Sequence, residues 1–231
     1  MDALARIEPV ARPLLREVDD VLSTLGAPVR HPVWSLLRRV GATPADAVAH
    51  FAELAGTAEG VSTPDQTTGA LRDAAGALRE QADGYAATAI PAATAWEGGA
   101  SDAYRVRAAA LDGHLRGGDG MAGRLIATAS YVDEIAGWQQ RSRDLLARTL
   151  AGVLTSAQAV TLRAGSPGPV APAAVGAAAD IGAAILIAVD GALEAANDLG
   201  PRWEQRLAEL PYRAPVEVGP TPFDVTIHLR H

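Results

Sequence analysis

Hydrophobic residues recur at steps of three and four over two long stretches of this chain, and a short turn separates the stretches. Such spacing places the residues on one face of an α-helix. The stripe before the turn consists of Leu71, Ala75, Leu78, Ala82, Tyr85 and Ala89. The stripe after the turn consists of Tyr104, Ala108, Leu111, Leu115, Ala122, Leu125, Ala129 and Val132. Because neither stripe is stable in water, the pattern predicts two helices that fold back on each other as a hairpin.

The predicted turn contains Trp96, Glu97, Gly98 and Gly99. Gly98 and Gly99 allow positive φ at the reversal, and the Trp96 ring is suited to filling the open end of the helix pair. Two interpretations of this turn stay open at the sequence level. Its tip is either a recognition feature or an ordinary helical corner with a buried tryptophan.

The second arm of the hairpin is unusually long. A straight helix from residue 101 to residue 163 would measure about 95 Å at 1.5 Å per residue. Gly117-Gly118-Asp119-Gly120 lies within it. We therefore expect a kink or a short break there.

The first 60 residues show a helical stripe that ends near Gly26 and two shorter helical patterns after it. Pro9 and Pro13 interrupt the stripe, so we expect the continuous helix to begin at one of these prolines. Thr43 and Pro44 are an N-cap and a first helical residue. These helices are expected to cover the hairpin.

The C-terminal part follows a Gly- and Pro-rich linker and begins with an apolar helix over residues 173–197. Its length approaches that of a membrane span, but Asp180, Asp190 and Glu194 make insertion costly. We therefore favour a buried bundle helix. Gly200-Pro201 is expected to end this helix and to start a short one containing Trp203. The tail from Pro211 alternates apolar and polar residues, as a strand does, and is expected to lie extended along the bundle or to pair with another chain.

These patterns predict an all-α fold, an elongated helical bundle built on a long helix–turn–helix hairpin, with extra N- and C-terminal helices and an extended tail. The predicted segments are N-terminal helices over 1–60, the hairpin over 61–163, a linker over 164–170, C-terminal helices over 171–211 and the tail over 212–231.

Composition narrows the possible functions. The chain is 48% hydrophobic but 4% aromatic, and its many alanines favour closely packed helices. A net charge of −7 argues against nucleic-acid binding, which needs a basic surface. The absence of cysteine excludes disulfides and thiolate metal ligands. The N-terminus has acids and a proline where a secretory signal peptide has a basic and then an apolar segment.

No motif for catalysis stands out. The glycines of residues 118–123 match a dinucleotide-binding loop, but a helical pattern lies on both sides where a strand would be needed. The five histidines lack metal-ligand spacing, and neither a nucleophile elbow nor a phosphate-binding loop occurs. We therefore predict no enzyme activity, no catalytic residues, no metal and no cofactor.

The run from Trp96 to Tyr104, with Trp-x-Gly between two helices and an aromatic residue eight positions later, resembles the WXG family of type VII (ESX) secretion substrates of actinobacteria. The resemblance covers roughly residues 63–160. It implies a hairpin that pairs into a four-helix bundle and leaves the cell without a cleaved signal peptide. In that family a tyrosine is followed four residues later by an acid. Here Tyr131 is followed by Asp133 and Glu134, and Ile135 stands at the fourth position.

The resemblance implies a non-enzymatic secretion substrate or component that acts through helix-bundle protein–protein interaction, secreted or at the cell surface. Its expected partners are a small helical WXG-like protein or a second copy, and the secretion machinery. The expected recognition residues are Trp96, Gly98, Tyr104, Tyr131, Asp133 and Glu134. The missing acid at position 135 means either that a partner supplies the export signal or that this route is not used. Two alternatives stay open: a membrane-acting or pore-forming helical assembly that uses residues 173–197, and a cytoplasmic adaptor or immunity-type chaperone.

Overall fold

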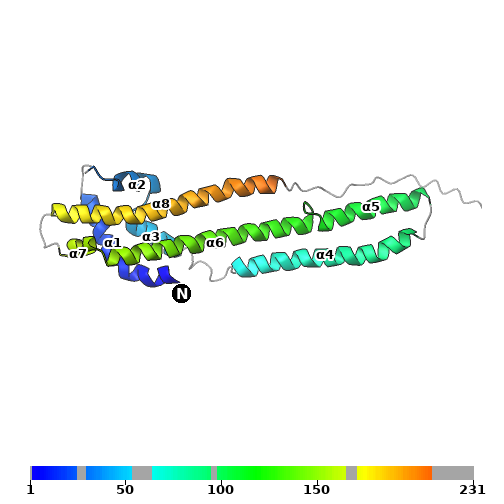
Figure 1. The fold of residues 1–231 in the computed structure, drawn as a ribbon, viewed down its shortest axis with the longest axis horizontal. Coiled ribbons are helices and arrows are strands. Elements are labelled where there is room, and N and C mark those ends of the chain that lie inside the picture. Colours follow the sequence, from blue (N-terminus) through cyan, green and yellow to red (C-terminus); the bar gives the residue numbers. More distant parts are fainter. Residues whose placement is uncertain (1, 25–29, 54–63, 95–97, 165–170, 210–231) are drawn as a thin grey trace, which may run out of the picture. The chain divides into compact units, whose positions relative to one another are not determined.

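The computed structural model describes residues 2–24, 30–53, 64–94, 98–164 and 171–209. These residues form α-helices joined by short turns, and no strand occurs among them (Figure 1). The prediction of an all-α helical bundle is therefore confirmed. The helices are α1 (Ala3–Thr24), α2 (Val33–Val40), α3 (Pro44–Glu53), α4 (Pro64–Thr94), α5 (Gly99–Arg116), α6 (Met121–Leu154), α7 (Ala157–Arg163) and α8 (Pro172–Ala208).

The chain forms two compact units. Unit 1 consists of Met1–Pro64 and Asp133–Arg202, and unit 2 consists of Asp65–Val132 and Trp203–His231. Helices α6 and α8 each contribute residues to both units. The N-terminal helices thus share unit 1 with the later part of the predicted second arm.

Unit 1 has a core of large aliphatic side chains. Helices α1, α2 and α3 pack there with α7 and with parts of α6 and α8, and α2 lies beside α8 (Figure 1). Helix α8 approaches its neighbours closely at Gly182, where a Cβ atom would lie 3.2 Å from side-chain atoms of Leu22 and Val33. The largest fully buried side chains of the unit are Leu4, Leu14, Leu15, Leu146, Leu150, Ile181, Ile185 and Leu186.

Two helix boundaries differ from the prediction. Helix α1 runs through Pro9 and Pro13, although each proline removes a backbone donor. Buried apolar residues on both sides of the prolines hold this segment in the core, and Arg12 donates two 2.8 Å hydrogen bonds to the Glu8 carboxylate. Helix α8 likewise continues through Pro201 instead of ending there. Tertiary packing therefore overrides the local helix-breaking tendency of proline.

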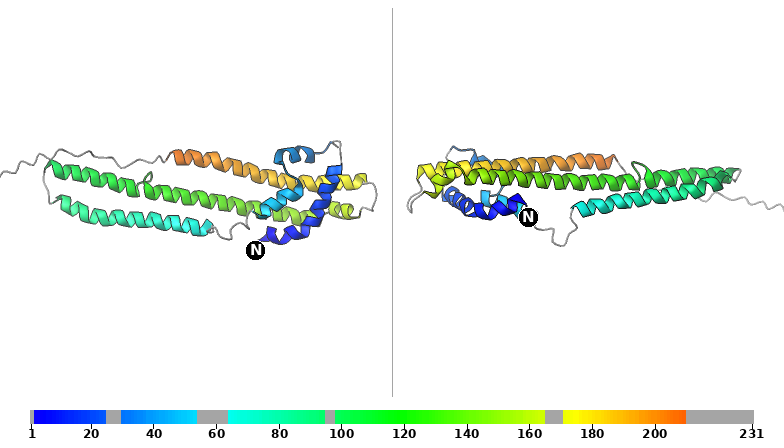
Figure 2. Two further views of the ribbon diagram at one scale, coloured as in Figure 1. Left: turned by 180° about the vertical axis from the view of Figure 1, so that it is seen from behind. Right: turned by 60° about the horizontal axis from the view of Figure 1, so that its bottom comes forward.

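Unit 2 contains the hairpin. Helix α4 runs alongside α5 and the start of α6 (Figure 2). Gly98 precedes α5 with φ +98° and ψ −179°, a conformation essentially confined to glycine, which confirms the positive φ predicted there. Gly99 is instead the first residue of the helix.

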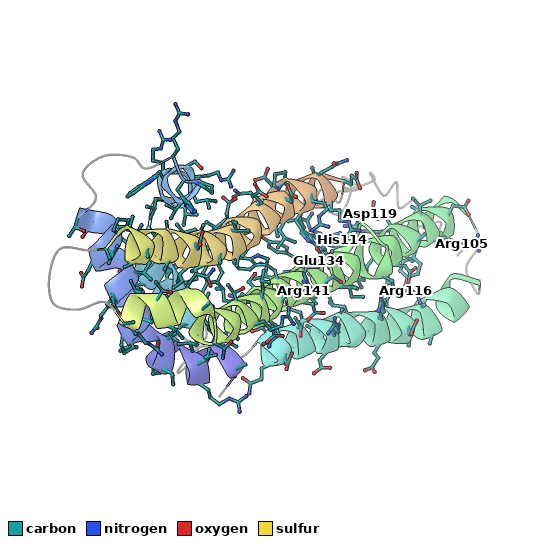
Figure 3. All side chains as sticks on the ribbon, turned by 60° about the vertical axis from the view of Figure 1, so that its left-hand side comes forward. Arg105, His114, Arg116, Asp119, Glu134 and Arg141 are labelled. Carbon is teal, nitrogen blue, oxygen red and sulfur yellow. The ribbon has the colours of Figure 1, made fainter. Side chains whose placement is uncertain are left out.

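The predicted interruption of the second arm is confirmed, because α5 ends at Arg116 and α6 begins at Met121. At this point Arg116 forms ion pairs with Asp83 of α4 and with Asp112 of its own helix (Figure 3). A second interruption at residues 155–156 was not predicted. Ser156 caps α7 there by accepting a 3.1 Å hydrogen bond from the Ala159 amide.

Candidate functional site

The two arms of the hairpin meet through small side chains. In α4 the buried positions are Thr68, Ala75 and Ala82, which are seven residues apart and at most 2% exposed. In the second arm the buried positions are Ser101, Ala122 and Ala129, also at most 1% exposed. Small side chains allow helix backbones to approach closely, so this contact buries little side-chain area.

Several large apolar residues of α4, α5 and the start of α6 are half-buried. In α4 they are Leu71, Leu78 and Tyr85, which keep the same seven-residue spacing as the small ones. We call these three and their counterparts on the second arm the lateral stripe. The counterparts on the second arm are Tyr104, Leu111, Leu115, Leu125 and Val132. Each leaves apolar area that a further helix could remove from water, at about 25 cal/mol per Å².

Tyr104, a predicted recognition residue, joins the two arms. A side-chain hydrogen bond between Tyr104 and Tyr85 raises the pKa of the Tyr104 phenol. Tyr104 is therefore part of the contact between α4 and α5 and also part of the lateral stripe. Gly98 lies exposed at the beginning of α5. Trp96 lies outside the described residues.

Tyr131, the second predicted recognition tyrosine, is half-buried against an aromatic residue of α8. Its ring centroid lies 5.2 Å from that of Trp203, with an interplanar angle of 48°. The Trp203 side chain is 3% exposed, and the Arg206 guanidinium carbon lies 5.0 Å from the centroid of its ring. Unit 2 therefore places a cation, an indole and a phenol in contact.

The two predicted acids, Asp133 and Glu134, are half-buried in unit 1. Arg202 forms an ion pair with the Glu134 carboxylate, with an N–O distance of 3.4 Å. Glu134 is labelled in Figure 3. Sequence reasoning did not identify Arg202, Trp203 or Arg206 as partners of the Tyr131 segment. The predicted helix ends at Pro201 and so does not align these three residues with Tyr131. In the structure α8 continues past Pro201.

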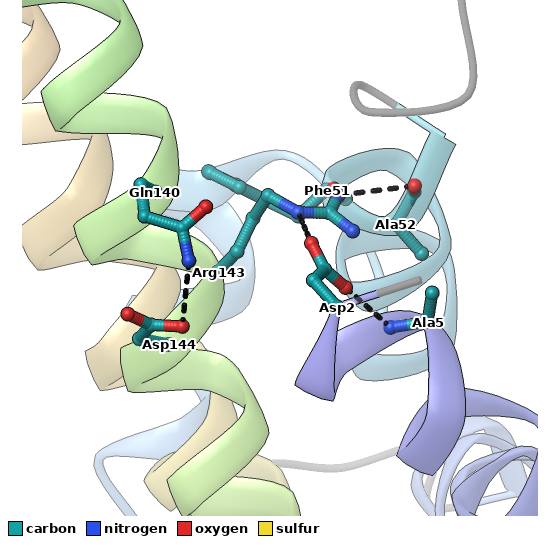
Figure 4. A network of polar contacts seen from close by, with 7 residues as sticks. All are labelled: Asp2, Ala5, Phe51, Ala52, Gln140, Arg143 and Asp144. Atoms are coloured by element: carbon teal, nitrogen blue, oxygen red, sulfur yellow. Dashed lines mark hydrogen bonds and ion pairs between the residues drawn. The ribbon is translucent and has the colours of Figure 1, made fainter.

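A buried polar network in unit 1 centres on Arg143. The Arg143 side chain is 4% exposed, pairs with the Asp2 carboxylate and donates to the backbone carbonyls of Phe51 and Ala52 (Figure 4). This hydrogen bond with Arg143 holds the pKa of Asp2 below its usual value, and Asp2 also accepts from the Ala5 amide at 2.9 Å. Arg143 thus ties the end of α3 to the beginning of α1. The network is structural, since its charges and carbonyls are used for holding helix ends.

The apolar helix α8 is long and apolar enough to cross a membrane, and 61% of its most apolar window is buried in the structure. Two of its acids pair with the segment around α2: Asp180 with His31 at 3.2 Å, and the buried Asp190 with Arg39. Both pairs lie within unit 1. Among the described residues no group of three or more His, Cys, Asp or Glu side chains could hold a metal ion.

Comparison with known proteins adds no relative. No protein-family model matches the chain, and neither the curated proteins nor the solved structures contain a match.

Proposed function

We propose that this protein is a non-enzymatic substrate or component of a type VII (ESX-type) secretion system and acts through helix-bundle protein–protein interaction. The proposal rests on the Trp-x-Gly hairpin pattern of the sequence and on one structural observation. That observation is the lateral stripe of unit 2, whose large apolar residues stay half-buried while alanine, serine and threonine fill the contact between the arms.

The lateral stripe suits a helical partner for a geometric reason. Leu71, Leu78 and Tyr85 recur every seven residues, the spacing at which knobs of one helix enter holes of another. The hydrogen bond between Tyr104 and Tyr85 brings the stripe of α4 next to that of α5. A partner helix with large apolar residues at the same spacing would cover both. A small helical protein or a second copy of this chain meets that requirement.

Export is tested directly by expressing the tagged full-length protein in its native host and comparing culture supernatant with cell lysate. The comparison is repeated in a strain without a functional type VII system. We expect an extracellular signal that disappears in the secretion-defective strain. Retention in the cytoplasm of both strains would contradict export and favour a cytoplasmic adaptor.

The role of the lateral stripe is tested in the same assay with Leu78→Glu and its neighbour Ala77→Glu. Leu78 is half-buried in the stripe, whereas Ala77 is exposed. A charge at position 78 would have to be desolvated under a partner helix, so Leu78→Glu should reduce export about tenfold or more. Ala77→Glu should leave export unchanged. Circular dichroism of both purified variants checks that helix content is retained.

The role of Trp96 is tested by Trp96→Ala. The variant should reduce export more than thermal stability if Trp96 is read by the secretion machinery. Equal losses of export and stability would identify Trp96 as a packing residue.

A second candidate function, membrane action, is favoured by the length and apolar character of α8. Flotation of the purified protein with anionic liposomes at neutral pH tests it. We expect the protein to stay in the bottom fraction, because Asp180 and Asp190 carry charge along this helix. Comigration with the liposomes would replace the secretion proposal with the membrane one.

A further inference from the structure

The last turns of α8 are set apart from the rest of that helix by Pro201. A proline inside a helix removes the hydrogen bond to the carbonyl four residues earlier, here that of Asn197, and its ring crowds that carbonyl. The helix therefore has a weak point just before Trp203. We call residues 203–208 the terminal turn of α8.

Trp203 is the anchor of this terminal turn. Its side chain is 3% exposed, whereas the five residues after it, from Glu204 to Ala208, are all exposed. Its ring lies 5.2 Å from that of Tyr131, and Arg206 lies on the ring at 5.0 Å. Trp203 is thus the buried side chain of a segment whose following five residues are exposed.

Tyr131, whose ring the indole contacts, is one of the recognition residues that the resemblance to the WXG family implies. We propose that the terminal turn of α8 is a latch, in which Trp203 covers Tyr131 until a partner or the export machinery displaces it. This inference rests on the proposed function for its biological consequence, because it assigns regulation to the same tyrosine. The covering contact itself is a property of the folded chain and can be measured without a partner.

The energetics suit a reversible contact. An aromatic pair, and a cation over an indole at a solvent-exposed site, each stabilise a fold only modestly beyond the buried area. The proline ahead of the segment lowers the cost of moving it as a unit. Release of Trp203 removes an apolar contact from the Tyr131 ring. A partner that places its own aromatic or apolar side chain against Tyr131 would replace much of that contact.

The latch is tested by nitration of the full-length protein with tetranitromethane, read for each tyrosine by peptide mass spectrometry. The chain has four tyrosines, so Tyr85 and Tyr104 serve as internal references. Trp203→Ala should raise the nitration rate of Tyr131 about fivefold or more relative to these references, as expected from loss of an aromatic pair and its buried area. Trp203→Phe, which keeps an aromatic ring in place, should restore slow nitration.

The matched control is Leu207→Ala, because Leu207 is on the same terminal turn but is 39% exposed. It should leave nitration of Tyr131 unchanged. Arg206→Gln removes the cation from the Trp203 ring at an exposed position and should raise the Tyr131 rate about twofold. If Trp203→Ala proves unfolded by circular dichroism, Arg206→Gln decides the question. A Tyr131 rate that stays at the wild-type value in the folded variants overturns the latch.

The regulatory consequence is tested separately, in the export assay. Tyr131→Ala should abolish export, and Trp203→Ala should increase it. If Tyr131→Ala abolishes export while Trp203→Ala leaves it unchanged, the latch is overturned and the proposed function stands. If the wild-type protein is not exported at all, the proposed function fails, and the nitration rates alone decide whether Trp203 covers Tyr131.

Discussion

Arg143 and Asp19 show how single charged residues are held inside unit 1. The Arg143 guanidinium group pairs with the Asp2 carboxylate and donates hydrogen bonds to the carbonyls of Phe51 and Ala52. Asp19 points from α1 to the start of α3, where it accepts a 3.3 Å hydrogen bond from the Ala45 amide. Its other carboxylate oxygen is buried without a partner. Arg143 likewise has one buried atom without a partner, its Nη2, although its Nε and Nη1 atoms are paired.

Replacing Arg143 with alanine should destabilise the protein by roughly 3 kcal/mol, because it leaves a carboxylate and helix-end carbonyls without their donor. Arg141→Ala is the matched control, since Arg141 lies on the same helix and is exposed. Urea unfolding followed by circular dichroism gives both free energies of unfolding. Similar values for the two variants would contradict the structural role of Arg143.

Asp2 and Asp19 should make the free energy of unfolding depend on pH in opposite directions. Hydrogen bonding to Arg143 lowers the pKa of Asp2, so its contribution to stability is present above about pH 3.8 and is lost as pH falls through the lowered pKa. Burial raises the pKa of Asp19, so folding favours its protonated form. Its contribution is therefore greatest below pH 3.8 and is lost as pH rises through the raised pKa.

Asp19→Asn removes the charge but keeps an oxygen acceptor for the Ala45 amide. The urea midpoint of this variant should exceed that of the wild type at pH 7, and the difference should shrink as the pH approaches 3.8. A constant difference across this range would show that desolvation of the Asp19 carboxylate is not the cause.

At the scale of elements, three glycines at the break between α5 and α6, Gly117, Gly120 and Gly123, leave no room for a Cβ atom. A Cβ atom on Gly123 would lie 2.0 Å from the Gly118 carbonyl oxygen. A Cβ atom on Gly118 itself would meet nothing within 4 Å. The two glycines therefore have different roles, although the sequence gives them the same appearance.

Gly123→Ala should lower the free energy of unfolding by about 2 kcal/mol, since the backbone has to shift to accept the methyl group. Gly118→Ala should change it by less than about 0.5 kcal/mol. Thermal unfolding of both variants provides the comparison. An equal effect of the two substitutions would mean that the loop rearranges freely around residue 123.

Element boundaries were predictable where glycine sets them and at Pro44, the predicted first residue of α3, but not where a proline lies inside a helix. Gly98 precedes α5 with positive φ, and the glycine run at 117–120 interrupts the arm, because these backbone conformations depend on local sterics. Pro9, Pro13 and Pro201 stay inside helices, because distant residues hold the helix together despite the missing donors. The sequence does not reveal those distant contacts.

At the scale of the whole molecule, the two units are built from different kinds of residues. The core of unit 1 consists of leucine, isoleucine and valine, each of which contributes about 1.5–3 kcal/mol on full burial. The fully buried described residues of unit 2 are small, apart from Trp203. Unit 2 alone therefore gains less from burial, which agrees with a partner-binding role.

This difference should appear in hydrogen exchange measured by mass spectrometry. Amides of α4, in unit 2, should exchange at least about tenfold faster than those of residues 142–150 of α6, in unit 1. A helical partner that covers the lateral stripe should slow exchange in α4. Equal protection of the two regions in the isolated protein would contradict the proposed weakness of unit 2.

The sequence by itself determined the all-α class, the hairpin and its glycine-dependent turns. These features depend on periodicity and local backbone sterics, which can be read from neighbouring residues. The candidate recognition tyrosines are implied only by the resemblance to the WXG family. The tertiary structure alone decided that α1 and α8 continue through their prolines and that Arg143 joins two helix ends. It also decided that the rings of Trp203 and Tyr131 are in contact. These outcomes depend on contacts between residues far apart in the chain, whose burial outweighs local propensity.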